Sequence, residues 1–439
     1  MNFEASLQYL LSLGHEMLAI KLGLRNTELL LESLGNPHES YESVQIAGTN
    51  GKGSTAVFLD SICRAAGIRT GLYTSPHLVS ITERIVIDGQ DISEEDFARY
   101  ASRVREAAER LVGQGKLAAL PTFFEHVTAI ALLAFKDAGV KLAVLETGLG
   151  GRLDATTVAA ARTVAVTPIT LDHQAYLGET ITEIAQEKAA IIRPGVNAVI
   201  APQDAEALRV IFQQCAACNV EPRVNDCRTT IIDTTSDGRF RVTFETSEGR
   251  DENVLLGLRG HHQVVNASVA IQLAESLRSR RFEVSDEAIT EGIQRANHPG
   301  RLELHEGFPS LLLDGAHNPA GAQALREFLD EFVSVPLTLV FGVMNDKKVD
   351  ELASVLFSRA DRLILTRPDN VRAADVAELQ PLASTMARDR AFLVTRSAAE
   401  ALQKAKEITP ANGLICVTGS LYLVGEVKAL TNAALAGAA

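Results

Sequence analysis

The stretch Val44-Gln45-Ile46-Ala47-Gly48-Thr49-Asn50-Gly51-Lys52-Gly53-Ser54-Thr55 organises the first half of this sequence. The apolar run Val44–Ala47 predicts a buried strand, and Lys52–Ala66 has the pattern of a helix. The glycines between them allow a tight turn that points several backbone N–H groups at one anion, and the start of a helix adds partial positive charge. A strand, a glycine loop and a helix in this order predict a phosphate-binding loop.

The side chains of the loop indicate which phosphate compound it binds. Lys52 can reach the β- and γ-phosphates of a nucleotide, and a hydroxyl at Ser54 or Thr55 can serve Mg²⁺. The spacing is shorter than in G-x-x-x-x-G-K-[ST], because only two residues separate Gly48 from Gly51, and Gly53 stands where Ser or Thr is expected. A glycine-rich turn without a ligand is the alternative, but the order of glycines, lysine and hydroxyls favours ATP.

Short β-branched runs alternate with amphipathic segments on both sides of this loop, which is typical of an α/β fold with a mostly parallel sheet between helices. Between about Arg223 and Leu258 apolar and polar residues alternate instead, which predicts a small antiparallel patch. The predicted strands are Val44–Ala47, Thr70–Tyr73, Leu142–Leu145, Val164–Thr167, Ala198–Ala201, Thr229–Asp233, Arg239–Glu245, Val254–Leu256, Leu311–Leu313, Leu337–Phe341, Arg362–Leu365, Phe392–Val394 and Leu414–Val417, and the further predicted helices are Phe123–Asp137, Ile181–Ile192, Asp204–Cys218 and Val264–Leu277.

The segment Asn297-His298-Pro299-Gly300 separates two α/β series. Proline and glycine end the preceding helix and suit a hinge. We therefore expect an ATP-binding domain at 1–297 and a Rossmann-like α/β domain at 298–439.

The composition argues against several classes of protein. The chain has 439 residues and a formal charge of −13, which argues against a general nucleic-acid partner. The start of the chain does not read as a signal peptide, and the apolar stretch Val127–Phe135 is about half of the ~20 residues that a membrane helix needs. The five cysteines do not form a disulfide pattern, and Cys215 and Cys218 read as two helix cysteines. We expect a cytoplasmic protein without a membrane partner.

Functional side chains follow three of the predicted strands. Ser75 follows the strand Thr70–Tyr73, and Glu146 lies at the carboxyl end of the strand Leu142–Leu145. His173 follows the strand Val164–Thr167. Ligands of open α/β sheets bind at the carboxyl ends of the strands, so these side chains are predicted to lie beside the phosphate loop. Mg²⁺ favours oxygen ligands, so metal binding and hydrogen bonding both stay open for His173.

Several stretches together resemble the folylpolyglutamate synthase and dihydrofolate synthase family, which is related to the Mur peptide ligases. They occur in the order of that family from about residue 20 to 425. The stretches are Gly48–Ser54, Tyr73–Leu78, Glu146–Thr156, Leu171–His173, Glu187–Ala189, Gly300–Glu303, Asp314–Pro319 and Gly419–Tyr422.

The resemblance implies a Mur-ligase-like first domain and a metal site. It places Mg²⁺ at Ser75, Glu146 and His173, with Ser54 as a further candidate and two ions in all. It also implies that Lys188 is carbamylated, so that a carboxylate would replace a cation and orient the second ion. The helical pattern alone reads Lys188 as a surface lysine.

The resemblance also assigns the substrates. ATP contacts fall on Gly51, Lys52, Gly53 and Ser54, together with Asn266, near the start of a helix, Arg301 at the hinge and Asp314 after a strand. A looser match places a substrate-covering loop at Lys21–Arg25. For the pterin it points to Thr122, Phe123, Phe124, Glu125, Leu153, Asp154 and Ala155, although the periodicity also fits Phe123 and Phe124 as helix core.

The expected function is ATP-dependent ligation of L-glutamate to dihydropteroate, to the γ-carboxylate of a folylpolyglutamate, or to both, with Lys52, Glu146, His173 and Lys188 as catalytic residues. A monomer is the default of the family. Gln174, Tyr176 and His298 depart from the family pattern and concern substrate preference. The alternatives are a Mur-type ligase for a cell-wall precursor or cyanophycin, and a non-catalytic ATP-binding regulator.

Overall fold

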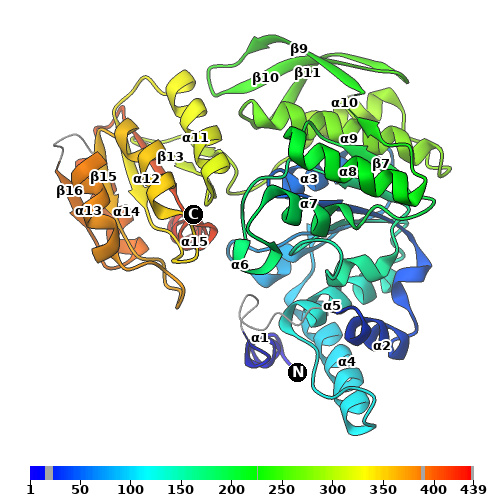
Figure 1. Ribbon diagram of the computed structural model, residues 1–439. Helices are drawn as coiled ribbons and strands as arrows, with labels where there is room; N and C mark the ends of the chain where they lie inside the picture. The colour runs from blue at the N-terminus through cyan, green and yellow to red at the C-terminus, as the bar shows by residue number, and fades with distance from the viewer. Residues whose placement is uncertain (15–22, 225, 387–390, 437–439) are drawn as a thin grey trace.

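A central eight-stranded sheet dominates the computed structural model, which describes all residues except 15–22, 225, 387–390 and 437–439 (Figure 1). Its strand order is β4-β3-β2-β5-β1-β6-β7-β8, and the six strands from β2 to β8 in this order are parallel. The hairpin β3–β4 adds an antiparallel edge. The strands are β1 Glu42–Ala47, β2 Thr70–Tyr73, β3 Ile85–Ile87, β4 Gln90–Asp91, β5 Leu142–Glu146, β6 Thr163–Val166, β7 Asn197–Ile200 and β8 Arg223–Val224.

Helices cover both faces of this sheet, as the apolar strands require. On one face α3 packs with α9 and α10, and Phe58, Leu59 and Ile62 of α3 share a core with Val44 and Ile46. On the other face α5 and α4 enclose a second core around Phe135. The helices are α1 Phe3–Ser12, α2 Arg25–Ser33, α3 Lys52–Ala65, α4 Glu94–Gly113, α5 Phe123–Asp137, α6 Gln174–Leu177, α7 Ile181–Ala189, α8 Ala205–Cys218, α9 His262–Arg278 and α10 Asp286–Arg295.

The predicted antiparallel patch is a separate three-stranded sheet, which lies at the top of Figure 1. It consists of β9 Cys227–Thr234, β10 Arg239–Thr246 and β11 Arg250–Arg259. Phe240, Val242 and Phe244 of β10 point into the core that α3 and α9 share. The alternation of the sequence therefore reports one buried face and one exposed face.

A six-stranded sheet forms the C-terminal part of the chain, to the left in Figure 1. Its order is β12-β13-β17-β14-β15-β16, and only β12 runs antiparallel to its neighbour. The α/β class with a mostly parallel sheet, a small antiparallel patch and a second α/β unit is thus confirmed. The elements are β12 Glu303–His305, β13 Ser310–Leu313, α11 Pro319–Phe332, β14 Leu337–Phe341, α12 Val349–Leu356, β15 Arg362–Leu365, α13 Val376–Met386, β16 Phe392–Val394, α14 Ala398–Ile408, β17 Leu414–Thr418 and α15 Leu421–Ala436.

Two predicted helix ends are wrong. The helix predicted to reach Ile192 ends at Ala189, because the N–H of Ile192 donates to the carbonyl of Ala189, three residues back, and closes a tighter turn there. Helix α9 begins at His262, two residues before the predicted start, so Asn266 lies in its second turn. Within the described ranges, no helix is both long enough and apolar enough to span a bilayer.

Candidate functional site

A cavity of about 440 Å³ opens between the eight-stranded and the six-stranded sheets. The phosphate loop, the ends of three parallel strands and the start of α9 line one side of it, and segments of the C-terminal sheet line the other side. The predicted site residues that line it are Gly51, Lys52, Gly53, Ser54, Ser75, Glu146, His173, Lys188, Asn266, Arg301 and Asp314.

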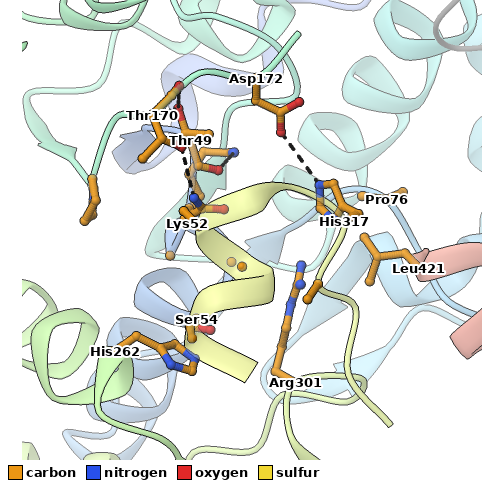
Figure 2. Close-up of a pocket in the computed structure, with 18 of the residues that line it drawn as sticks. Thr49, Lys52, Ser54, Pro76, Thr170, Asp172, His262, Arg301, His317 and Leu421 are labelled. Atoms are coloured by element: carbon orange, nitrogen blue, oxygen red, sulfur yellow. Dashed lines mark hydrogen bonds and ion pairs between the residues drawn. The ribbon is translucent and has the colours of Figure 1, made fainter. Parts of the chain in front are cut away.

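The phosphate loop forms one wall of this cavity (Figure 2). Gly51 adopts a left-handed φ of 87°, and a Cβ there would collide with the amide oxygen of Asn266. No side chain caps α3, so the N–H groups of its first turn, which lack carbonyl partners in their own helix, stay available to a ligand at the cavity wall. This geometry suits an anion.

Lys52 curls back onto the loop in this structure. Its Nζ donates to the carbonyls of Gly48 and Thr49, both at 3.2 Å. Burial lowers the pKa of Lys52, while the carboxylates of Glu146 and Asp172 act against the shift. A phosphate in the cavity would offer this ammonium a stronger partner than two neutral carbonyls.

Glu146 is a buried carboxylate at the end of β5. Only 6% of the residue is exposed, and its Oε2 accepts a hydrogen bond from the backbone N–H of Ser75 at 3.1 Å. Burial raises the pKa of Glu146, and the ammonium of Lys52 counters this shift. The two strand ends therefore bring Ser75 and Glu146 into direct contact.

His173 lies in the same wall with an unusual backbone. Its φ is 52°, and burial lowers the pKa of its ring to about 3. Its Nδ1 is buried without a hydrogen-bond partner. A left-handed residue with an orphaned ring nitrogen is costly to hold unless a ligand uses it.

Lys188 is buried rather than at the surface, so the interpretation from the helical pattern alone is wrong. Only 4% of it is exposed, and its Nζ donates to the carbonyl of Gly48 at 2.7 Å. Burial lowers the pKa of Lys188 to about 7, and Lys52 adds to the shift. The side chain of Lys188 points into the protein because Ile184 and Ala185 of α7 pack on the sheet, and Lys188 lies one turn further along the same helix face.

Asp172 joins the two sides of the cavity. Its carboxylate accepts from Lys347 Nζ at 2.7 Å and from Asn318 Nδ2 at 3.1 Å, and His317 Nε2 lies 3.9 Å away (Figure 2). Burial alone would raise the pKa of Asp172, but the ammonium of Lys347, which is also its hydrogen-bond donor, holds the pKa well below its usual range. An ionised, buried carboxylate thus holds three side chains of the C-terminal part.

Arg301 and Asp314 reach the cavity from the C-terminal part. Asp314 is 7% exposed and accepts from the N–H groups of Leu302 and Ala316 at 2.9 and 3.0 Å. Burial raises its pKa, and Arg301 opposes the rise. Arg301 Nη1 donates to the carbonyl of Gly315 at 3.4 Å, which leaves further guanidinium donors for a ligand.

The residues predicted for the pterin do not line the cavity. Thr122 and Glu125 form the capping box of α5, and Asp154 accepts from the N–H groups of Gly148, Leu149 and Thr156. The ring of Phe124 packs against Gly148, which does line the cavity. None of the seven residues Thr122, Phe123, Phe124, Glu125, Leu153, Asp154 and Ala155 is among those that line this cavity. Lys21 and Leu22 of the predicted covering loop lie outside the described residues.

Several cavity residues were not predicted. Lys347 lies six residues beyond the end of β14, so the rule of strand ends could have found it. His262 and Gln263 open α9, and burial lowers the pKa of His262 to about 4. No local pattern marks His298, which was noted only as a departure from the family. Burial together with Arg301 lowers its pKa to about 3.

Two family models match the chain. The Mur ligase middle domain matches residues 46–274, and the dihydrofolate synthetase C-terminal domain matches residues 302–431. The first match contains the phosphate loop and most of α9, and the second contains all six strands of the C-terminal sheet.

Curated relatives extend over the chain at moderate identity. The Halobacterium salinarum protein named "Probable bifunctional folylpolyglutamate synthase/dihydropteroate synthase" is 37% identical over 98% of this chain and 51% of its own length. The chain thus spans about half the length of that relative. The dihydrofolate synthase/folylpolyglutamate synthase of Bacillus subtilis is 32% identical over 94% of this chain and 96% of its own length.

Solved structures agree in fold. Mycobacterium tuberculosis folylpolyglutamate synthase complexed with ADP superposes with a TM-score of 0.90 at 31% identity, covering 98% of this chain and 99% of the other. E. coli FolC in complex with DHPP and ADP gives a TM-score of 0.87 at 30% identity, covering 99% and 98%. The chain therefore belongs to the folylpolyglutamate synthase/dihydrofolate synthase family.

Proposed function

We propose that this chain is an ATP-dependent ligase that joins L-glutamate to dihydropteroate, to the γ-carboxylate of a folylpolyglutamate, or to both, through an acyl phosphate. The observation that carries the proposal is the single cavity that the phosphate loop, the buried Glu146 and Arg301 share. A phosphoryl donor on the loop would face groups from both sheets, which is what transfer to a second substrate needs.

The first step transfers the γ-phosphoryl group of ATP. A carboxylate oxygen of the acceptor attacks the γ-phosphorus, the bond to the β–γ bridging oxygen breaks, and ADP leaves. Lys52 and the first-turn N–H groups of α3 would hold the phosphates, and Arg301 would stabilise charge on the transferring oxygens. Asn266 and Asp314 would contact the nucleoside part.

The second step forms the amide. The amine of glutamate attacks the acyl carbon, inorganic phosphate leaves, and the amine gives up a proton. Water would hydrolyse the acyl phosphate, so the cavity has to be closed during the reaction. The contacts of Asp172 with Lys347 and Asn318 hold the two sheets together over the cavity and support this closure.

The residues present fit Mg²⁺. Glu146 and the hydroxyls of Ser54 and Ser75 are oxygen donors, and the buried Nδ1 of His173 lacks a partner. Among the described residues, no group of three or more His, Cys, Asp or Glu side chains is arranged so that it could hold a metal ion by itself, so phosphate and water oxygens would complete the coordination. Bound Mg²⁺ would neutralise charge on the phosphates, and we propose two ions.

Lys188 fits the carbamylation that the family resemblance implies. Carbamylation requires an unprotonated amine, and the lowered pKa of about 7 makes a large neutral fraction available near neutral pH. The carbamate would replace a cation that now faces the Gly48 carbonyl and would add a carboxylate to the site. A ¹³C carbamate signal after incubation with ¹³CO₂, lost in Lys188→Met, would test it.

The remaining parts of the proposal concern organisation. The segment between α10 and β12 separates the sheets, which supports domains at 1–297 and 298–439. We propose that the chain acts as a monomer in the cytoplasm with ATP, L-glutamate and a pterin-containing acid as its partners. The pterin contacts that the resemblance implies for Thr122, Phe123, Phe124, Glu125, Leu153, Asp154 and Ala155 stay a prediction, which the KM for the acceptor in variants at these positions would test.

Phosphate release in the presence of ATP, glutamate and Mg²⁺ tests the function. Dihydropteroate and tetrahydrofolate are assayed separately, with each substrate omitted in turn. We expect turnover that requires both glutamate and one of the two acceptors. Absence of turnover with both acceptors would remove the folate assignment, and nucleotide binding without acceptor-dependent hydrolysis would favour a regulator.

A further inference from the structure

Ser54 of the phosphate loop is held in a chain of hydrogen bonds that reaches the segment between the two sheets. Its Oγ lies 3.1 Å from Nδ1 of His298 and 3.3 Å from Nε2 of Gln263. The Oε1 of Gln263 in turn accepts from the amide Nδ2 of Asn266 at 2.9 Å. His298 lies between α10 and β12, far from Ser54 in the sequence.

The chemistry of the amide fixes the direction of the bond from Gln263, and the tautomer of His298 sets the direction of the other bond. Because Oε1 of Gln263 accepts from Asn266, its amide nitrogen faces Ser54, and that nitrogen can only donate. Ser54 Oγ accepts this bond and has one proton of its own to give. The Nδ1 of a neutral imidazole protonated on Nε2 is an acceptor for that proton.

This arrangement decides where the free lone pair of Ser54 lies. When His298 carries its proton on Nε2, the proton of Ser54 bonds to Nδ1 of His298 and one lone pair accepts from Gln263, so the hydroxyl oxygen keeps one lone pair, and Ser54 lines the cavity. A hydroxyl that binds a cation has to turn its proton away from it. Without an acceptor at position 298, the proton of Ser54 would be free to rotate into the cavity.

The ring of His298 packs directly against Gly53 of the phosphate loop. A Cβ at residue 53 would lie 2.9 Å from Cε1 of His298 and 3.4 Å from Glu146 Oε2. Real side chains do not approach so closely, so the glycine that replaces the usual Ser or Thr of phosphate loops is the residue that makes room for this ring.

We infer that His298 is a positioning residue that accepts the hydroxyl proton of Ser54 and so keeps an oxygen lone pair of Ser54 directed at a nucleotide-bound divalent cation. The inference rests on the proposed function, because it presumes that a magnesium nucleotide binds at the loop. Partners in the outer shell of a metal commonly change its affinity by 10–100-fold.

Two substitutions separate the hydrogen bond from the packing. His298→Asn places an amide oxygen near the position of Nδ1 and keeps an acceptor, whereas His298→Phe fills the space of the ring without one. Titration calorimetry with ADP is carried out once with Mg²⁺ and once with EDTA, and thermal unfolding checks both variants. If His298→Phe does not fold, His298→Leu serves as the variant without an acceptor.

We expect H298F to bind ADP on the order of tenfold more weakly than the wild type when Mg²⁺ is present, and equally well in EDTA. H298N should stay close to the wild type in both conditions. Equal binding by H298F and the wild type with Mg²⁺ would overturn the inference, and so would equal losses in H298F and H298N or a loss of the same size in EDTA. The ligase activity of the wild type is measured separately, so its absence would contradict the proposed function without affecting this comparison.

Discussion

Helices α3 and α5 both start beside the carboxyl ends of the parallel strands, but they use their first turns in opposite ways. Helix α3 starts at a left-handed glycine and has no side-chain cap, and its first turn lines the cavity. Helix α5 starts with a capping box in which Thr122 and Glu125 satisfy the backbone N–H groups of each other. Free N–H groups at a helix start bind anions, and capped ones stabilise the fold.

The difference concerns how the predicted residues of the two segments are used. The residues of the α3 loop were predicted from the order of its glycines, lysine and hydroxyls, and those at the start of α5 from the resemblance. The polar groups of the α3 loop face the cavity, whereas those at the start of α5 are engaged inside the protein. Substitutions at the two helix starts should therefore affect different quantities.

The largest effect is expected for Lys52→Ala in the α3 loop. Loss of the ammonium should lower the rate of acceptor-dependent phosphate release on the order of 10²–10³-fold, because one preorganised charge partner of the phosphates is removed. Its present partners are two carbonyls of its own loop, so the folded state should persist. Steady-state kinetics and circular dichroism measure both. Activity close to the wild type would remove the loop from the mechanism.

The next effect concerns the contact between the two sheets. In Lys347→Met the carboxylate of Asp172 loses its ion-pair partner. Both side chains of this pair are only 8% exposed, so water cannot replace the lost partner. Removing one partner of a buried pair costs about 3 kcal/mol. Urea unfolding should show that loss, and addition of Mg²⁺ and ADP should recover part of it. Lys348→Met, at an exposed neighbour, is the matched control and should change stability little. An equal response of the two variants would contradict the proposed closure.

A smaller effect is expected for Glu125→Ala at the start of α5. The carboxylate accepts from the N–H of Thr122 at 2.6 Å and from the hydroxyl of Thr27 at 3.3 Å. Loss of the cap should lower the free energy of unfolding by about 1–2 kcal/mol, with Glu125→Gln between the variant and the wild type. The KM for the acceptor should change little. A large rise in KM at unchanged stability would show that Glu125 binds substrate.

The smallest effect is a pH dependence at the same helix. His126 is fully buried between Tyr9 and the Thr122 carbonyl, and burial lowers its pKa to about 4. The unfolded chain binds a proton near pH 6.5 and the folded chain does not, so this contribution is complete above pH 6.5 and is lost as the pH falls toward 4. Between pH 6.5 and 5.5 the loss is about 1 kcal/mol.

The variant His126→Gln measures that contribution. It should show a shallower fall of unfolding free energy with pH than the wild type, whatever its stability at pH 8. Urea unfolding at several pH values gives both slopes. Identical slopes would mean that His126 has the same pKa in the folded and unfolded chains.

The sequence by itself determined most of the strands, the five helices α3, α5, α7, α8 and α9, and the order of the site residues along the chain. Strand cores such as Leu142–Leu145 are apolar because helices cover both faces, and this signal is local. The rule that ligands bind at strand ends then placed Ser75, Glu146 and His173 beside the loop, and all three line the cavity. The glycines of the loop can be recognised from the sequence because a tight turn requires them.

Tertiary packing determined which polar groups face the cavity. The side chain of Lys188 points into the protein because α7 packs on the sheet. The carboxylate of Glu125 is engaged at the start of its own helix, where it accepts from the N–H of Thr122. The contacts of Asp172 with Lys347 and of Ser54 with His298 join residues more than a hundred positions apart. Local patterns report only whether a residue is apolar, helical or extended, and such long-range partners become neighbours only when the two sheets are packed together.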